Sequence, residues 1–386
     1  MTRPRHAIWG AAAAISALVL TAGCGSQGGS SNSGGYTIAV LTSQTGSASQ
    51  LGVGEQRGAQ LAADYVNAHG GVNGKQISLA TADDQSQPNE ALQQARTLLS
   101  KNPVALVGPS VVANCKAVGP LVAEKGPVNY CLSPGIDASG YLWSSSAKTD
   151  ALAEETMNYW KGKGITKVAV VNTTDASGTD GGRASVEAAK KIGVTITAQV
   201  TYDPTAVSAT AQLQQAMASG PQALVLWSTG TPVGVALKGI QQLGIKLPVM
   251  TTDGNLASTF LKRIADYTPD TLLIPATRDF WWETLPANDP SRALEQQYHD
   301  SYHAKYGEQP DFGPGVAYDA VLVVAEALKK ANSTDAAKIR TAMESIDGFT
   351  GVVGTYHMSP TDHRGLTVAD VAMVQAKDGK FTYVGK

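Results

Sequence analysis

From Tyr36 onward, short apolar segments alternate with segments whose apolar residues recur at helical spacing. The first pair is residues 36–41 (YTIAVL), expected as a strand, and residues 56–69, expected as a helix that ends at Gly70 and Gly71. Parallel strands need a crossover connection, and helices of this length supply one. The alternation therefore predicts an α/β fold built on parallel, doubly wound sheets.

The alternation runs through two cycles, and 386 residues are too many for one ordinary core. The second cycle begins after Thr149, and later helical and strand-like segments return to the first. We expect one lobe from residues 36–148 and 276–350, and another from residues 149–275 and 351–386. Several chain segments, rather than one linker, would then join the lobes.

The first 23 residues have the pattern of an export signal. Arg3 and Arg5 precede an apolar run at residues 7–20 that is too short to span a bilayer stably. Small residues then precede Cys24, an arrangement that resembles the bacterial lipobox and implies a lipid on the Cys24 thiol. Residues 24–35 are nearly all Gly, Ser, Gln and Asn, which predicts a flexible tether. We expect an exported protein anchored to the outer face of the cell membrane; an ordinary cleaved signal with an incidental cysteine is the alternative.

Cys115 and Cys131 are the remaining cysteines, an even pair in an oxidising compartment. Cys115 is expected near the start of a helix and Cys131 at the end of the next strand. A disulfide between them is our prediction, with two free buried thiols as the alternative, because sequence does not give the Cα separation that bridging requires.

Signatures of catalysis, metal binding or cofactor binding are not evident. Gly52, Gly54 and Gly58 have the wrong spacing for a phosphate loop, and we interpret them as turn glycines. His299 and His303 lie one helical turn apart, but no third metal ligand is obvious, so a solvated helix face is the better interpretation. The net charge is −2 and no basic stripe is present, which argues against nucleic acid as a partner. We expect no enzyme activity, no cofactor and no metal.

Loops rich in Ser, Thr, Asp, Asn and Gly follow six of the expected strands. In doubly wound sheets, ligands gather at the carboxyl ends of the strands, where such loops can offer N–H groups and hydroxyls. Asp253 in the last loop could pair with an ammonium or an amide N–H. The aromatic cluster at residues 280–282 lines the same cleft, packs in the interior or forms a contact between the lobes. The loops expected to form the cleft are residues 42–52, 108–113, 133–137, 172–178, 228–231 and 252–254.

Five segments carry a further pattern: TGSASQLG (45–52), GAQLAADYVNAHGGVNGKQI (58–77), DDQSQP (83–88), ALVGP (105–109) and LSPG (132–135). Together they resemble the branched-chain amino acid type of ABC-transporter solute-binding proteins, which have the class I periplasmic-binding-protein fold. The resemblance implies an extracytoplasmic protein that captures a small polar solute by lobe closure and delivers it to permease subunits. We expect a monomer; an exported sensor of the same fold is the alternative function.

The ligand-binding positions of the family's amino-acid binders can be carried over onto this sequence. The aromatic of the first loop, the carboxylate-binding serine and the following threonine fall on Leu51, Val112 and Asp137. Two tyrosines of the second lobe fall on Ser177 and on Thr229 or Gly230, while the acid that pairs with the ammonium is kept as Asp253. The complete predicted site is Ser47, Leu51, Val112, Ala113, Ser133, Ile136, Asp137, Ser177, Thr229, Gly230 and Asp253.

Most of the family's amino-acid clamp is therefore replaced in this sequence. An acid at Asp137, where a ligand carboxylate would lie, opposes simple leucine-like binding through charge repulsion. We expect a different small polar solute, such as an amide, a cation or a hydroxylated compound.

Overall fold

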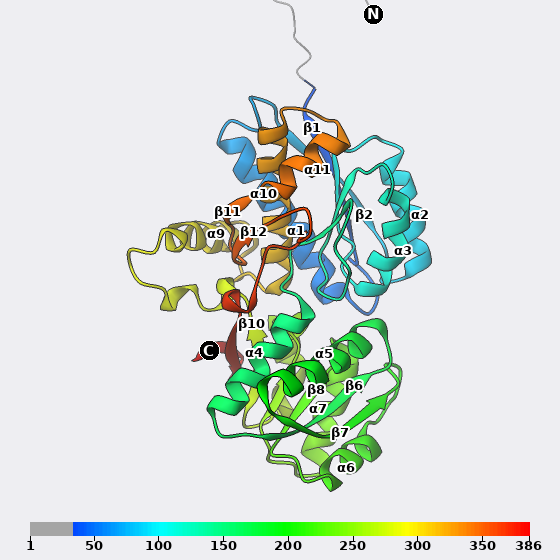
Figure 1. The fold of residues 1–386 in the computed structure, drawn as a ribbon, viewed down its shortest axis with the longest axis vertical. Coiled ribbons are helices and arrows are strands. Elements are labelled where there is room, and N and C mark those ends of the chain that lie inside the picture. The colour runs from blue at the N-terminus through cyan, green and yellow to red at the C-terminus, as the bar shows by residue number, and fades with distance from the viewer. Residues whose placement is uncertain (1–33) are drawn as a thin grey trace, which may run out of the picture. The chain divides into compact units, whose positions relative to one another are not determined.

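The computed structural model describes residues 34–386, and Figure 1 shows how their helices and strands are arranged. The predicted signal peptide, the lipidation site Cys24 and the tether as far as residue 33 lie outside the described residues. Within the described part of the chain, no helix is both long enough and apolar enough to cross a membrane.

A five-stranded parallel sheet forms first, with the strand order β2-β1-β3-β4-β5. The order reverses direction between β1 and β3, which is the point of a doubly wound sheet where ligands gather. The strands are β1 (Tyr36–Thr42), β2 (Ile77–Asp83), β3 (Ala105–Val107), β4 (Val128–Cys131) and β5 (Leu142–Ser144). The crossover helices are α1 (Ser49–Ala68), α2 (Pro88–Leu99) and α3 (Val112–Val122).

Both faces of this sheet are covered, because successive side chains of a strand point to opposite faces. Ile38 and Val40 of β1 lie in the core on the side of α1, whereas Ala39 and Leu41 lie in the core on the side of α2 and α3. Figure 1 shows α2 and α3 on one side of the sheet and α1 on the other. Three later helices pack on the α1 side: α9 (Pro290–Tyr306), α10 (Phe312–Ala331) and α11 (Ala336–Glu344).

The second sheet has seven strands in the order β14-β13-β10-β9-β8-β6-β7. The five strands from β10 to β7 in this order are parallel. β13 pairs antiparallel with β10, and β14 pairs antiparallel with β13 at the edge of the sheet. The strands are β6 (Lys167–Thr173), β7 (Thr195–Tyr202), β8 (Ala223–Trp227), β9 (Val249–Thr251), β10 (Leu272–Ala276), β13 (Ala372–Lys377) and β14 (Lys380–Gly385). The helices are α4 (Thr149–Gly162), α5 (Ala176–Ile192), α6 (Thr210–Ala218), α7 (Thr231–Gln242) and α8 (Ser258–Ile264).

The chain passes between the two sheets after β5, after β10 and after the hairpin of β11 (Asp347–Thr350) and β12 (Thr355–His357). We call the five-stranded sheet with α1–α3 and α9–α11 the first lobe, and the seven-stranded sheet with α4–α8 the second lobe. The two predicted doubly wound sheets are thus present. The exact lobe limits drawn from the sequence remain a prediction.

Helix α1 begins earlier than the sequence predicted, at Ser49 rather than residue 56. The predicted start was too late because glycine is a poor helix former, and glycines lie in the first turns of this helix. The interpretation of Gly52, Gly54 and Gly58 as turn glycines is wrong, since all three lie inside α1. Gly58 permits close packing instead, because a Cβ there would lie 2.0 Å from the carbonyl oxygen of Pro314. In α5, Gly181 has the same role, since a Cβ would lie 2.0 Å from the Trp227 ring.

A short 3₁₀ turn precedes the strands of the C-terminal tail. It spans Val368–Asp370, and β13 begins at Ala372. A capping box closes that turn, in which the Thr367 side chain accepts from the Ala369 N–H and Asp370 accepts from the Thr367 N–H. Strands as short as β5, with three residues, and β11, with four, show too little periodicity to be recognised from sequence.

Candidate functional site

A cavity of about 410 Å³ is lined by loops of both lobes. Every predicted loop contributes to it, and each loop follows a parallel strand at its carboxyl end. The first-lobe residues are Ser47, Ala48, Gln50 and Leu51 after β1, Ser110–Ala113 after β3 and Leu132–Pro134 after β4. The second-lobe residues are Asp175–Ser177 after β6, Thr229, Thr231 and Pro232 after β8, and Thr252–Gly254 after β9.

Most of the predicted site residues lie in the cavity wall. Ile136, Asp137 and Gly230 do not. Ile136 is buried against Val112 and the two cysteines, the Asp137 side chain is exposed, and the Gly230 N–H is bound to Asn255 Oδ1 at 2.9 Å. The acid at Asp137 is therefore not brought to the cavity, and it gives no support to the argument against leucine-like binding. A ligand contact by the residues that do line the wall stays a prediction: Ser47, Leu51, Val112, Ala113, Ser133, Ser177, Thr229 and Asp253.

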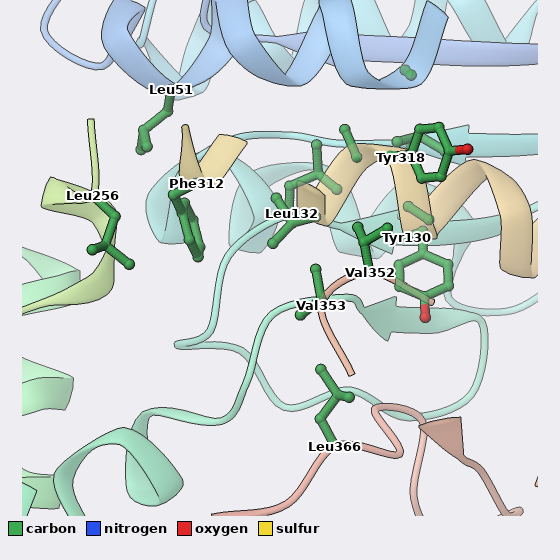
Figure 2. Packing of buried hydrophobic residues seen from close by; sticks show 14 of the residues in the cluster. Leu51, Tyr130, Leu132, Leu256, Phe312, Tyr318, Val352, Val353 and Leu366 are labelled. Carbon is green, nitrogen blue, oxygen red and sulfur yellow. The ribbon is translucent and has the colours of Figure 1, made fainter. Parts of the chain in front are cut away.

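An apolar wall of the cavity comes partly from a residue that sequence reasoning missed. Phe312 starts α10, which joins the first lobe only after the chain has completed most of the second. Figure 2 shows Phe312 below Leu51 of α1 and to the right of Leu256, and the Phe312 N–H donates to the Leu256 carbonyl at 2.9 Å. No local pattern relates a residue this distant in sequence to the strand-end loops, so only tertiary packing reveals it.

Three helices begin at the cavity without a side-chain N-cap. The N-cap residues of α1, α3 and α7 are Ala48, Val111 and Gly230, and none makes a capping hydrogen bond. By contrast, α5 is capped by Asp175, which accepts from the Gly178 N–H at 2.8 Å. The uncapped first turns leave backbone N–H groups without intrahelical partners, and the helix dipole adds partial positive charge there. This part of the wall favours a ligand anion such as a carboxylate.

Asp253 gives the cavity wall a negative group. Its Oδ1 accepts from Thr252 Oγ1 at 2.7 Å and from the Gly254 N–H at 2.9 Å, while its Oδ2 has no hydrogen-bond partner among the described residues. Burial raises the pKa of Asp253 to about 6, and the bonds from Thr252 and Gly254 limit the rise. At neutral pH the carboxylate is mostly ionised, and its free oxygen is suited to an ammonium or an N–H donor.

One side chain at the cavity bridges the two lobes. Gln50 of α1 donates from Nε2 to the Gly254 carbonyl at 3.2 Å, and its Oε1 accepts from Arg263 Nη2 of α8 at 2.7 Å. Gln50 lines the cavity, whereas Arg263 does not. The bridge holds the start of α1 against the second lobe.

A disulfide fixes two of the first-lobe segments. Cys115 in α3 and Cys131 at the end of β4 are bonded, with their Cα atoms 6.0 Å apart, and both residues are fully buried. Val112 and Ser133, which line the cavity, lie close in sequence to these cysteines. The bridge therefore ties the loop after β3 to the loop after β4.

Two other features of the sequence lie elsewhere. The aromatic cluster packs away from the cavity, with Phe280 edge-on to Phe381 at 5.7 Å between ring centroids. His299 lies 5.3 Å from the ring of Trp282, whereas His303 is exposed. Within residues 34–386, no group of three or more His, Cys, Asp or Glu side chains is placed to hold a metal ion.

Comparison with known proteins gives a consistent result. A family of periplasmic binding proteins matches residues 35–380. Leu/Ile/Val-binding protein homolog 2 of Brucella abortus (strain 2308) is 25% identical over 370 residues, which cover 90% of this chain and 93% of that protein. An extracellular ligand-binding receptor of Rhodopseudomonas palustris HaA2 has a similar fold, with a TM-score of 0.81, 23% identity, and coverage of 91% of this chain and 99% of that one.

A second solved structure is the branched-chain amino acid transporter substrate binding protein LivJ of Streptococcus pneumoniae, in complex with isoleucine. It has a TM-score of 0.77 and 23% identity, and the match covers 91% of this chain and all of that one (100%). At these identities the solved structures show the fold, and the predicted two-lobed class I architecture is confirmed. Because the family match spans nearly all of the described chain, this protein belongs to the periplasmic binding protein family and has its solute-binding fold.

Proposed function

We propose that the protein is the extracytoplasmic solute-binding component of an ABC importer and that it captures an amino-acid-like solute. The observation that carries the proposal is the polarity of the cavity wall. Uncapped helix starts at α1, α3 and α7 favour a carboxylate, and the free Oδ2 of Asp253 favours an ammonium. A solute that bears both groups matches this wall better than a sugar or a polyamine.

The apolar residues of the wall extend this assignment to the side chain of the solute. Leu51, Val112, Leu132 and Phe312 all line the cavity. With Asp137 away from the wall, an apolar or mildly polar side chain is compatible with the site. The names of the Brucella relative and the isoleucine complex of the Streptococcus protein support the same class of ligand.

Capture follows from closure of the lobes on the solute. A ligand that contacts both walls stabilises the closed arrangement only by its better contacts with that state. The closed form would then deliver the solute to permease subunits. A lipid on Cys24 and the tether would keep the protein on the outer face of the membrane.

A thermal-shift screen tests the ligand class. The probes are the proteinogenic amino acids, their amides, polyamines and sugars, added to the protein that begins at Gly35. A ligand that binds only the folded state raises the melting temperature, so we expect shifts from α-amino acids and none from sugars. A shift confined to compounds that lack either the carboxylate or the ammonium would contradict the proposed ligand class. Uptake of the identified solute, lost on deletion of the gene, would test the importer role.

A further inference from the structure

Four buried polar residues form a chain of hydrogen bonds that ends in the cavity wall. The Ser43 N–H donates to Ser110 Oγ at 2.9 Å, Ser43 Oγ donates to Asp84 Oδ1 at 2.6 Å, and Ser110 Oγ is bonded to Glu55 Oε2. Ser43, Glu55 and Asp84 are fully buried, and Ser110 is 2% exposed. Ser110 is the member of this chain that lines the cavity. A group within the protein interior is thus connected directly to the ligand site.

The hydroxyl of Ser110 has a limited capacity, with one O–H to donate and two lone pairs to accept. The Ser43 N–H occupies one lone pair. If Glu55 is ionised, its Oε2 takes the Ser110 O–H, and the second lone pair of Ser110 is left for the cavity. If Glu55 carries a proton, its own O–H donates to that second lone pair, and the Ser110 O–H is left to donate into the cavity.

We propose that Ser110 is a specificity-determining residue of the solute site, and that the proton on Glu55 decides whether its hydroxyl donates to or accepts from the solute. The inference rests on the proposed function, because it concerns the same cavity. With the proton present, Ser110 assists the uncapped helix starts in binding a carboxylate. Without the proton, Ser110 offers that carboxylate only a repulsive lone pair.

The surroundings of Glu55 favour the protonated form. Ser110 after β3 is bonded to it, and the backbone of Gly313 faces it from α10. Asp84 after β2 is the charged group that acts on it, and Ser43 after β1 links Asp84 to Ser110. Burial raises the pKa of Glu55 to about 8; the Ser110 bond opposes the rise, and the charge of Asp84 adds to it. The oxygens Glu55 Oε1 and Asp84 Oδ2 have no hydrogen-bond partners among the described residues. Glu55 therefore holds its proton at neutral pH and loses it as the pH rises through about 8.

A titration without ligand tests the connection between Glu55 and Ser110 directly. In protein labelled with ¹³C at the glutamate carboxyl carbons, the resonance missing from Glu55→Gln identifies Glu55. We expect its midpoint near pH 8 and a higher midpoint in Ser110→Ala, because the Ser110 hydroxyl stabilises the ionised form. A midpoint in the ordinary glutamate range, or one that Ser110→Ala leaves unchanged, would overturn the proposal. This result does not depend on the identity of the solute.

Calorimetric titration with L-isoleucine tests the effect on recognition. In the native protein, affinity should fall by about tenfold between about pH 7 and about pH 9 as Glu55 loses its proton. The Glu55→Gln amide donates to Ser110 at every pH, so the affinity of this variant should not decrease over that pH range. Ser110→Ala should bind L-isoleucine weakly at both pH values, with no such decrease. The solute's own amine titrates equally in all variants, and Glu155→Gln is the matched control, since Glu155 is a buried carboxyl of α4 away from the cavity.

An unchanged pH dependence in Glu55→Gln would refute the recognition step. If L-isoleucine does not bind at all, the proposed ligand class is in question, while the ligand-free titration still decides whether Glu55 and Ser110 share the proton. The two failures are therefore distinguishable.

Discussion

Asp253 is the residue whose chemistry most directly shapes the site. It is buried, two hydrogen bonds fix its Oδ1, and its Oδ2 has no partner among the described residues. An unpartnered carboxylate oxygen in the interior destabilises the empty protein, because the charged group has lost its water. A bound ammonium would remove that penalty. The same atom is thus unfavourable for folding and favourable for binding.

Asp253→Asn should therefore weaken binding while leaving the fold intact. The amide keeps the shape but loses the charge, and a hydrogen bond to a charged group contributes about 1.5–3 kcal/mol. We expect affinity for an amine-bearing solute to fall by roughly tenfold to a hundredfold at neutral pH, with an unchanged or higher melting temperature. Because the pKa of Asp253 is about 6, the native protein should also lose affinity as the pH falls below that value.

Isothermal titration of both proteins measures this difference. Asp311→Asn is the matched control, because Asp311 has the same raised pKa of about 6 but accepts from the Ser258 N–H at 2.9 Å and does not line the cavity. That control should be less stable yet bind normally. Equal affinity of Asp253→Asn and the native protein would show that Asp253 does not contact the solute.

At the scale of elements, the site is a set of helix starts held against strand ends. The sheets fix where each helix begins, because the crossover helices are packed on both faces. The disulfide between Cys115 and Cys131 adds a covalent restraint between α3 and β4. These two elements carry the cavity residues Val112 and Ser133. The bridge should therefore affect both stability and recognition.

Replacing both cysteines, as Cys115→Ala with Cys131→Ala, tests this restraint. The two residues are 16 apart in sequence, and closing a loop of about that length constrains the unfolded chain by about 3 kcal/mol. We expect the free energy of unfolding in urea to fall by roughly that amount and the affinity to weaken as the two loops gain freedom. The native protein treated with a reductant under mild denaturation should behave in the same way. If reduction under denaturing conditions leaves the free energy of unfolding of the native protein unchanged, the bridge does not form.

At the scale of the whole molecule, the contacts between the lobes set the balance between open and closed forms. Gln50 reaches from the first lobe to Gly254 and Arg263 of the second. Gln50 lines the cavity and Arg263 does not. A variant of Arg263 therefore changes only lobe closure, whereas a variant of Gln50 can also change a contact with the ligand. The bridge stabilises an arrangement in which the lobes approach each other.

Removing the bridge should open the ligand-free protein. In Gln50→Ala and in Arg263→Ala, we expect spin labels at the exposed positions Lys116 and Lys238 to show longer separations than in the native background. The double variant should open little further, since the two residues share one interaction. Gln60→Ala is the control, because Gln60 of α1 bonds only to Asp64 of the same helix. Additive opening in the double variant would contradict a shared bridge.

The sequence alone determined the architecture and the approximate place of the site. Apolar segments such as residues 36–41 alternate with helical segments, and this periodicity is local, so it can be recognised without knowing what packs against what. Because parallel strands have their carboxyl ends at the same edge of a sheet, the polar loops were predicted to lie together. In the structure, each of these loops contributes residues to the cavity. Asp253 was identified in this way.

Tertiary structure decided the features that depend on contacts between distant segments. Phe312 enters the wall from a helix late in the chain, Asp137 turns away from it, and the bridge of Gln50 joins residues more than 200 positions apart. The bond between Glu55 and Ser110 likewise crosses from α1 to the loop after β3. Local periodicity shows which face of a helix or strand is buried, but not which residues of other elements pack against that face. Side-chain contacts and the protonation of buried groups are determined only when separate elements pack together.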